Sequence, residues 1–253
     1  MIAAPGTTAW YVYGVVDASA SLPPGRLRLV EEGPLAAVAG AVPLSEFGEE
    51  ALAERLNDRR WLEVHVREHE EVLQRLAAGS TVVPFRFGAI YRQLDDVAAM
   101  LQERRADFTA ALARVRGRIE VGVKGWADRE QVSASLGDAP PQAASGRAYL
   151  ERRLTERQRV EQVAALLADI AGDAHARLLR HADEGVANRT QPPELTGRAE
   201  SMILNGAYLV GGDGAELAAE VAALEAEHRG RGVSFETTGP WPPHNFVEPG
   251  EGS

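Results

Sequence analysis

The chain has no cysteine among its 253 residues, and this absence excludes several kinds of chemistry. Without thiols there is no disulfide framework, no cysteine nucleophile and no thiolate metal site. Lysine is nearly absent too, since Lys124 is the sole example, and 37 acids against 27 bases leave a net charge of -10. Because non-specific affinity for nucleic acids comes from neutralising phosphates, this charge balance argues against a nucleic-acid partner.

Long apolar runs are also missing. The longest uncharged stretches, at 34–45 and 201–212, are well short of the ~20 apolar residues that span a bilayer. The N-terminal segment resembles a secretory signal only at Ala18-Ser19-Ala20, because no Lys or Arg precedes its apolar part and Asp17 interrupts it. We therefore expect a soluble protein with no membrane partner, and the lack of cysteine fits a cytoplasmic location without requiring it.

Strand and helix patterns alternate in the first half of the chain. Residues rich in β-branched and aromatic side chains predict a strand at 10–17, and a run of small residues predicts another at 35–42. A third strand segment, 81–91, contains Pro84 and Gly88, so an edge position, a bulge or a short hairpin is expected there. The remaining predicted elements of this half are helices at 49–77 and 94–115 and a strand at 118–126.

The second half begins with a tract, 127–145, that is polar, small and proline-containing and is predicted to be a linker or a long surface loop. The longest helical pattern follows at 147–183. Its apolar stripe is flanked by charged faces, which is typical of a solvated helix, with a coiled-coil or partner-binding helix as the alternative. The last predicted elements are a strand at 199–210, a turn at 211–214, a helix at 215–229 and a strand at 233–237.

This order of elements predicts an α+β fold with two domains, each an antiparallel sheet covered on one face by helices. Split βαβ units of the ferredoxin-like kind are the simplest architecture that uses these elements. We place an N-terminal α+β domain at 1–117, a C-terminal α+β domain with the long helix at 118–247, and a flexible tail at 248–253.

The segment HVREH at 65–69 matches the H-x-x-E-H pattern of a metallopeptidase class, in which two histidines bind zinc and a glutamate activates water. Glu103 and Asp107 on the next predicted helix are possible third ligands. The helical stripe instead turns His69 toward the core and leaves His65 at its edge. We therefore predict no metal site, and a zinc-dependent hydrolase is kept as the alternative function.

No other set of residues forms a complete active site. The glycine-rich segment 211–214 lacks the spacings of nucleotide-binding loops, and Asp213 and Glu216 beside it would repel phosphate. Paired carboxylates fall in solvated helices or loops, where they make poor acid–base catalysts. The sequence therefore predicts no catalytic residue, no cofactor and no enzyme activity.

Two segments are unusual without being catalytic. Strand alternation predicts that Phe85 and Phe87 share one face while Arg86 points to the other, which is typical of a core strand with one surface arginine. Three prolines stiffen the segment GPWPPHNF at 239–246. Such a tail either packs back onto its domain or presents aromatic side chains to a partner.

Five segments resemble, in order, the gas vesicle protein GvpL/GvpF family: WYVYGV at 10–15, VPFRFG at 83–88, EVGVK at 120–124, LNGAYLV at 204–210 and GPWPPHNF at 239–246. The last of these is the most specific, although His244 stands where a tyrosine is common in the family. The resemblance covers the chain from about Ala9 to Val247.

This resemblance implies a non-enzymatic accessory or minor structural protein of gas vesicles, the gas-filled protein shells that give some prokaryotes buoyancy. It implies two α+β domains of modified ferredoxin-like type. It also implies that the partners are the small hydrophobic shell protein, gas vesicle shell protein A, and other accessory proteins. A protein that holds a hydrophobic subunit needs exposed apolar surface. We predict that this surface is made by Phe85, Arg86, Phe87, Trp241 and Phe246.

Overall fold

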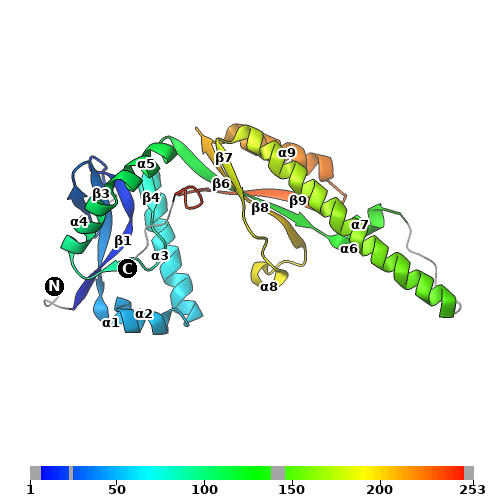
Figure 1. Cartoon of the computed structure of the whole chain (residues 1–253), viewed down its shortest axis with the longest axis horizontal. Helices are drawn as coiled ribbons and strands as arrows, with labels where there is room; N and C mark the ends of the chain where they lie inside the picture. The colour runs from blue at the N-terminus through cyan, green and yellow to red at the C-terminus, as the bar shows by residue number, and fades with distance from the viewer. Residues whose placement is uncertain (1–6, 23–24, 138–145, 248–253) are drawn as a thin grey trace. The chain divides into compact units, whose positions relative to one another are not determined.

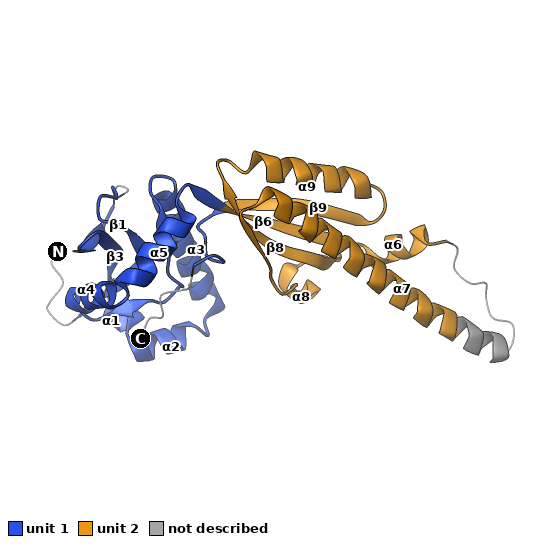
Figure 2. Ribbon diagram, turned by 45° about the horizontal axis from the view of Figure 1, so that its top comes forward, with its two compact units in different colours: residues 1–119, 241–253 blue, residues 120–240 orange. Residues whose placement is uncertain are grey.

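The computed structural model describes residues 7–22, 25–137 and 146–247, with the side chains of the last range from 153 onward. The chain has an α+β fold with two antiparallel sheets. It divides into two compact units: unit 1 comprises residues 1–119 and 241–253, and unit 2 comprises residues 120–240 (Figure 2). The predicted tail at 248–253 lies outside the described residues.

The elements of the first half, in chain order, are β1 (Thr8–Asp17), β2 (Leu27–Glu32), β3 (Leu35–Pro43), α1 (Leu44–Phe47), α2 (Glu49–Arg55), α3 (Arg59–Ala77), β4 (Val82–Pro84), β5 (Ile90–Tyr91), α4 (Leu94–Glu103) and α5 (Arg105–Val115) (Figure 1). Those of the second half are β6 (Arg118–Ala127), α6 (Arg129–Ser135), α7 (Gly146–Leu178), the 3-10 helix η1 (Leu179–His181), β7 (Glu184–Ala187), α8 (Pro193–Thr196), β8 (Ser201–Gly211), α9 (Ala215–His228) and β9 (Val233–Trp241).

The sheet of unit 1 has the strand order β2-β3-β1-β4, and β5 pairs with β1 beside β4. Segment 81–91 thus lies at an edge, as its proline and glycine predict, and splits into β4 and β5 with a loop between them. The register of β1 against β3 shifts between Val12 and Gly14, and a Cβ at Gly14 would come within 2.6 Å of the Val83 carbonyl oxygen. Only glycine therefore allows β4 to approach β1 this closely.

Helices cover both faces of this sheet, where the sequence predicts one covered face. Val82 packs with Val72, Leu73 and Leu76 of α3, whereas the adjoining Phe85 stacks on Phe108 of α5. Strand β3 is buried at every position from Leu35 to Gly40. Because successive strand residues face opposite sides, continuous burial requires cover on both. Figure 1 shows α3 behind the sheet and α4 and α5 in front of it.

Both helices predicted in the first half are broken once. The helix predicted at 49–77 is interrupted after α2, and α3 begins at Arg59 because the Asp58 side chain accepts hydrogen bonds from the backbone N–H groups of Arg60 and Trp61. The helix predicted at 94–115 is interrupted at Arg104. Short-range apolar spacing continues across both breaks, so periodicity alone does not reveal them.

The sheet of unit 2 has the order β7-β8-β6-β9, and α7 and α9 pack on one of its faces (Figure 2). On that face the Nδ1 atom of His175 in α7 forms a hydrogen bond of 2.7 Å with the Tyr208 hydroxyl of β8. The ring centroids of His228 in α9 and Phe235 in β9 are 5.9 Å apart. From Ser201 to Gly206, β8 alternates between half-buried and buried residues. This alternation is typical of a sheet with helices on one face, whereas β8 is buried at every position from Gly206 to Val210 and is therefore covered on both faces there.

The predicted linker at 127–145 is structured in its first part, which corrects the prediction. Ala127 ends β6, and α6 follows with Asp128 as its N-cap and Val132 buried. The Arg159 guanidinium of α7 donates to the Ser133 hydroxyl at 2.8 Å and to the Gly137 carbonyl. Residues 138–145 lie outside the described residues.

Strands β2 and β7 are additional to the predicted elements, and both lie at sheet edges. The division into domains at 117/118 and the ferredoxin-like type stay predictions. The compact units differ from those domains in one respect, because the segment from Trp241 groups with unit 1. None of the described helices combines the length and the apolar character required to cross a bilayer.

Candidate functional site

The first histidine of the H-x-x-E-H segment, His65, is held by its own helix. Its Nδ1 donates to the Trp61 carbonyl at 2.9 Å, and its ring stacks on the Trp61 ring with centroids 4.0 Å apart. The other ring nitrogen, Nε2, lies 3.6 Å from Glu46. This histidine therefore belongs to the surface of α3 and packs on an aromatic neighbour.

The second histidine, His69, is buried in the core of unit 1 with both ring nitrogens occupied. Its Nε2 donates to the Phe85 carbonyl at 3.1 Å, and its Nδ1 accepts from the Tyr11 hydroxyl at 2.9 Å. That hydroxyl in turn accepts from the Gly88 N–H at 3.0 Å. Burial lowers the pKa of His69 and raises the pKa of Tyr11. His69 thus ties α3 to β1 and to the segment after β4.

These contacts leave no zinc-ligand set at the segment. The possible third ligands also lie elsewhere: Glu103 lines a groove, and Asp107 pairs with Arg104 at 3.7 Å. Within the ranges that the structure describes, no three His, Asp or Glu side chains are grouped so as to hold a metal ion. The geometry therefore favours the structural interpretation of both histidines.

The two phenylalanines of the 85–87 segment face different parts of the core, which corrects the prediction that they share a face. Phe85 is fully buried, and its ring centroid lies 5.8 Å from that of Phe108. Phe87 is half-buried and packs edge-on against Tyr11 and Trp61 on the α3 side. The physical reason is that β4 ends at Pro84, so strand alternation does not extend through these residues. Arg86 between them is exposed.

The C-terminal segment packs on unit 1. Pro242, Pro243, Phe246 and Val247 are buried, and Trp241 is 37% exposed. The Nε2 atom of His244 lies 3.4 Å from a carboxylate oxygen of Glu70 on α3. Of the two interpretations of this tail, packing onto the protein is the one the structure supports.

Among the five residues predicted to bind a partner, the structure therefore leaves Arg86, Trp241 and part of Phe87 accessible. Phe85 and Phe246 are core residues in this conformation, with 0% and 2% exposure. Arg86 differs from the others because it also lines a cavity in unit 1. Partner binding by this set stays a prediction.

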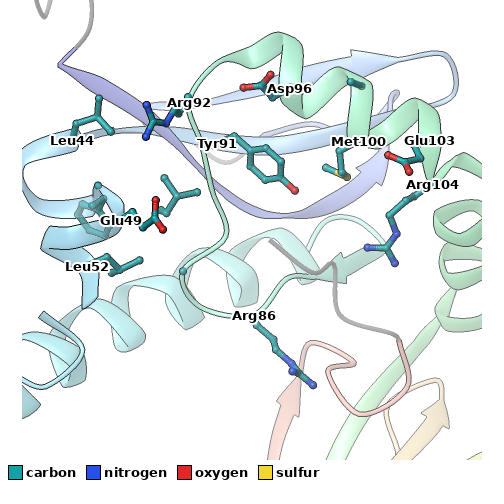
Figure 3. A pocket seen from close by; sticks show the side chains of 15 residues that line it. Leu44, Glu49, Leu52, Arg86, Tyr91, Arg92, Asp96, Met100, Glu103 and Arg104 are labelled. Atoms are coloured by element: carbon teal, nitrogen blue, oxygen red, sulfur yellow. The ribbon is translucent and has the colours of Figure 1, made fainter. Parts of the chain in front are cut away.

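This cavity is an open groove of about 1270 Å³ in unit 1 (Figure 3). One wall comes from α1, α2 and the turn between them, the other from α4, and the loop and strand from Gly88 to Arg92 run between the walls. The apolar lining side chains are Leu44, Phe47, Leu52, Ile90, Ala99 and Met100. The charged ones are Glu49, Arg86, Arg92, Asp96, Glu103 and Arg104.

The position of α4 follows from its sequence. Asp96, Ala99, Met100 and Glu103 are spaced i, i+3, i+4 and i+7, so they share the face that lines the groove. Val97 and Leu101 point to the core and are fully buried. Sequence reasoning misses this groove because its residues come from two separate segments of the chain, 44–52 and 86–104. The available signal is the edge segment with Pro84 and Gly88, which marks an interrupted sheet edge.

Unit 2 has two smaller hollows. One, of about 690 Å³, lies beside α8 and is lined by Pro192, Leu195 and Met202 among others. The other, of about 580 Å³, lies at the start of α9, where Asp213 and Glu216 stand beside Arg180 and His181. Both are smaller than the groove in unit 1, which is therefore the candidate functional site.

Comparisons with known proteins agree on one relationship. A family model described as "Gas vesicle synthesis protein GvpL/GvpF" matches residues 9–248. Gas vesicle protein L of Streptomyces sp. (strain CB03234) is 35% identical over 224 residues, which cover 87% of this chain and 82% of that protein. Gas vesicle protein F of the same strain is 30% identical over 259 residues, covering 94% and 99%.

Solved structures agree on the fold. The crystal structure of the gas vesicle protein GvpF from Anabaena sp. PCC7120 matches with a TM-score of 0.71 at 18% identity, covering 98% of this chain and 99% of that one. That of GvpF from Microcystis aeruginosa matches with a TM-score of 0.67 at 18% identity, covering 95% and 99%. At this level of identity the likeness concerns the fold alone.

Proposed function

The chain belongs to the GvpL/GvpF family of gas vesicle synthesis proteins, and from that premise we propose that it binds the hydrophobic shell protein and supports vesicle assembly. We propose gas vesicle shell protein A and other accessory proteins as its partners. It acts without catalysis, in the cytoplasm and in association with the vesicle. Its two halves act as domains of modified ferredoxin-like type.

The observation that carries this proposal is the open groove in unit 1. It combines six apolar side chains with six charged ones, a composition that suits a protein surface better than a small reactive substrate. A groove of about 1270 Å³ also exceeds the usual range of small-ligand pockets, about 300–1,000 Å³. Exposed apolar contact surface is what an assembly protein for a hydrophobic subunit requires.

The accessible part of the predicted set adjoins this groove through Arg86. The net charge of -10 supports the same role, because repulsion between like-charged copies keeps a protein dispersed while it handles an aggregation-prone partner. Phe85 and Phe246 support the surface from within the core, by positioning the segments that carry Arg86 and Trp241.

The direct test is capture of purified shell protein by the immobilised full-length chain at low and high salt. We expect saturable capture that bovine serum albumin does not reproduce. If no capture occurs with the shell protein alone or with the other accessory proteins present, the proposed binding role is wrong.

Metal analysis of the same preparation distinguishes the alternative function, a zinc hydrolase, from the proposed one. Stoichiometric zinc that is lost in His69→Ala would favour a zinc hydrolase over an assembly protein. We expect less than stoichiometric zinc in both proteins, because the ring nitrogens of His69 are engaged by Tyr11 and Phe85.

A further inference from the structure

The groove contains the free edge of a sheet. Strand β5 pairs with β1 through Ile90 and Tyr91, and its other side has no strand partner among the described residues. Gly88, Ile90, Tyr91 and Arg92 all line the groove. The side of β5 that faces away from β1 therefore faces the cavity. A free edge of this kind is a template for a further strand.

The register identifies which backbone groups point into the cavity. The Val12 N–H donates to the Ala89 carbonyl at 2.9 Å, and Tyr11 lies opposite Ile90. In an antiparallel pair, residues alternate between bonding their partner strand and pointing away from it. Ala89 and Tyr91 thus bond toward β1, while the backbone N–H and C=O of Ile90 point outward.

The space between the two walls of the groove suits an added strand. The Ile90 side chain packs in the cluster of Tyr11, Phe47 and Trp61, on the side of α2. Tyr91 points to the opposite side, toward Met100 of α4 (Figure 3). The open layer continues the sheet between helices on its two faces. A strand added to β5 would lie about 4.7–4.9 Å from it in the hydrogen-bonding direction and would continue the sheet between these walls.

Two arginines without an acidic partner among the described residues lie at the ends of this site. Arg92 and Arg86 lie beyond opposite ends of β5 (Figure 3). Neither guanidinium forms an ion pair within the described parts of the chain. Between them, the walls offer Leu52 and Met100, together with the acids Glu49, Asp96 and Glu103. A complementary segment has apolar side chains that contact Leu52 and Met100, carries carboxylates at its ends, and has none in its middle, where these acids would repel them.

We propose that the groove binds an extended segment of the shell protein as an added strand beside β5, with acidic residues of that segment paired with Arg86 and Arg92. This inference rests on the proposed function, since it names the site and the mode by which the same partner is held. Backbone hydrogen bonds to Ile90 and Arg92 supply the register, and the two walls select apolar side chains.

A matched pair of variants on one helix tests the site. Ala99→Trp fills the groove from an exposed position of α4, and Gln102→Trp adds the same bulk to an exposed position outside the groove. We expect capture of the shell protein to weaken at least about tenfold in Ala99→Trp and to stay within about twofold in Gln102→Trp. Thermal unfolding of both variants shows that the fold is retained.

The charge at the ends is tested by a double reversal. Arg86→Glu with Arg92→Glu is compared with Arg60→Glu and Arg67→Glu, which change the net charge equally at exposed positions of α3. We expect the first pair to weaken capture by about tenfold or more at low salt and the second pair to have a smaller effect.

Hydrogen exchange identifies the mode of binding. A strand added to β5 slows exchange at the amides of Ile90 and Arg92 when shell protein is bound. Equal capture by Ala99→Trp and wild type would overturn the groove while leaving the proposed function intact. Capture that depends on the groove without slower exchange at these two amides would overturn the strand mode and favour a helix. If the wild type captures no shell protein, both the function and this inference are wrong.

Discussion

The two sheets use the same kinds of strand but bury them differently. In unit 1, β3 consists mainly of Ala, Val and Gly and is buried on both faces between α3 and the α4–α5 pair. In unit 2, β8 is continuously buried only from Gly206 to Val210 and alternates in its first half, and α7 and α9 pack on one face. On the other face the Trp126 indole N–H donates a hydrogen bond of 2.9 Å to the Glu236 carboxylate. The Arg198 guanidinium carbon lies over the Trp126 ring, 4.3 Å from its centroid.

This difference relates the size of the side chains in a strand to whether the faces of its sheet are covered. In the sheet that is covered by helices on both faces, the central strand has small side chains. In the sheet with an open face, polar and aromatic side chains pair on that face. Unit 1 is therefore expected to respond strongly to volume changes in its strands, while unit 2 is expected to tolerate them on the open face. Four predictions test this contrast.

The largest effect is expected from Phe85→Ala in unit 1. The fully buried ring fills the space next to Phe108, and its removal should lower the free energy of unfolding by about 3–5 kcal/mol. Leu195→Ala in unit 2, where the side chain is 75% exposed, should change it by less than about 0.5 kcal/mol. Urea unfolding measures both, and similar values would remove the distinction between core and surface.

An enlarged side chain tests the two faces directly. Ala37 in β3 is fully buried between Val15 of β1 and Val30 of β2, so Ala37→Leu should destabilise unit 1 by about 1–3 kcal/mol. Ser234→Leu on the open face of β9 should cost at most about 0.5 kcal/mol. Equal costs in denaturant unfolding would mean that the second sheet is covered on both faces as well.

The helix caps allow the same substitution to be compared in both units, since each unit has a helix with an aspartate at its N-cap. Asp58 caps α3 with hydrogen bonds to Arg60 and Trp61, and Asp128 caps α6 with hydrogen bonds to Glu130 and Gln131. Replacing either aspartate with Ala should cost about 1 kcal/mol. Hydrogen exchange should assign the loss to α3 in one variant and to α6 in the other. Loss in the opposite unit would contradict the division into two compact units.

The smallest effect is expected from acid, and it should originate in unit 1. Burial lowers the pKa of His69 below its ordinary value of 6.5, so its contribution to stability is complete above that pH and declines as the pH falls below it. Burial alone would raise the pKa of Glu70, but the His244 ring outweighs it and the pKa is lowered, which adds acid sensitivity below pH 4.5.

Unfolding of wild type and His69→Gln at pH 7.0 and 5.5 measures the histidine contribution. Glutamine retains a donor and an acceptor but does not titrate, so the stability of the variant should change less between the two pH values. An equal loss in both proteins would place the acid sensitivity elsewhere.

Most elements could be predicted from sequence because their patterns are local. The run of β-branched and aromatic residues in β1 and the apolar spacings of α3, α7 and α9 each specify one element. The breaks at Asp58 and Arg104 are harder to see, because a capping side chain competes with a periodicity that continues across it. The exposed short helix α6 lacks a sufficient apolar stripe for recognition, since Val132 is its only fully buried side chain.

The candidate site was less accessible to sequence reasoning. Aromatic residues at 85–87 suggest contact surface, but whether a ring is exposed depends on Phe108, Tyr11 and Trp61, which lie in distant elements. The groove likewise requires α2, β5 and α4 to meet. A sequence pattern can mark an interrupted edge strand, and only the tertiary arrangement reveals the walls beside it.

The return of the C-terminal segment to unit 1 has a consequence for biosynthesis. Phe246 and Val247 are buried there, although unit 2 separates them from the rest of unit 1 in the chain. During translation, the first unit to emerge from the ribosome lacks these core residues until unit 2 has been synthesised. Completion of unit 1 is thereby coupled to the synthesis of unit 2, and a chain that stops within unit 2 would be defective in the part that was made first.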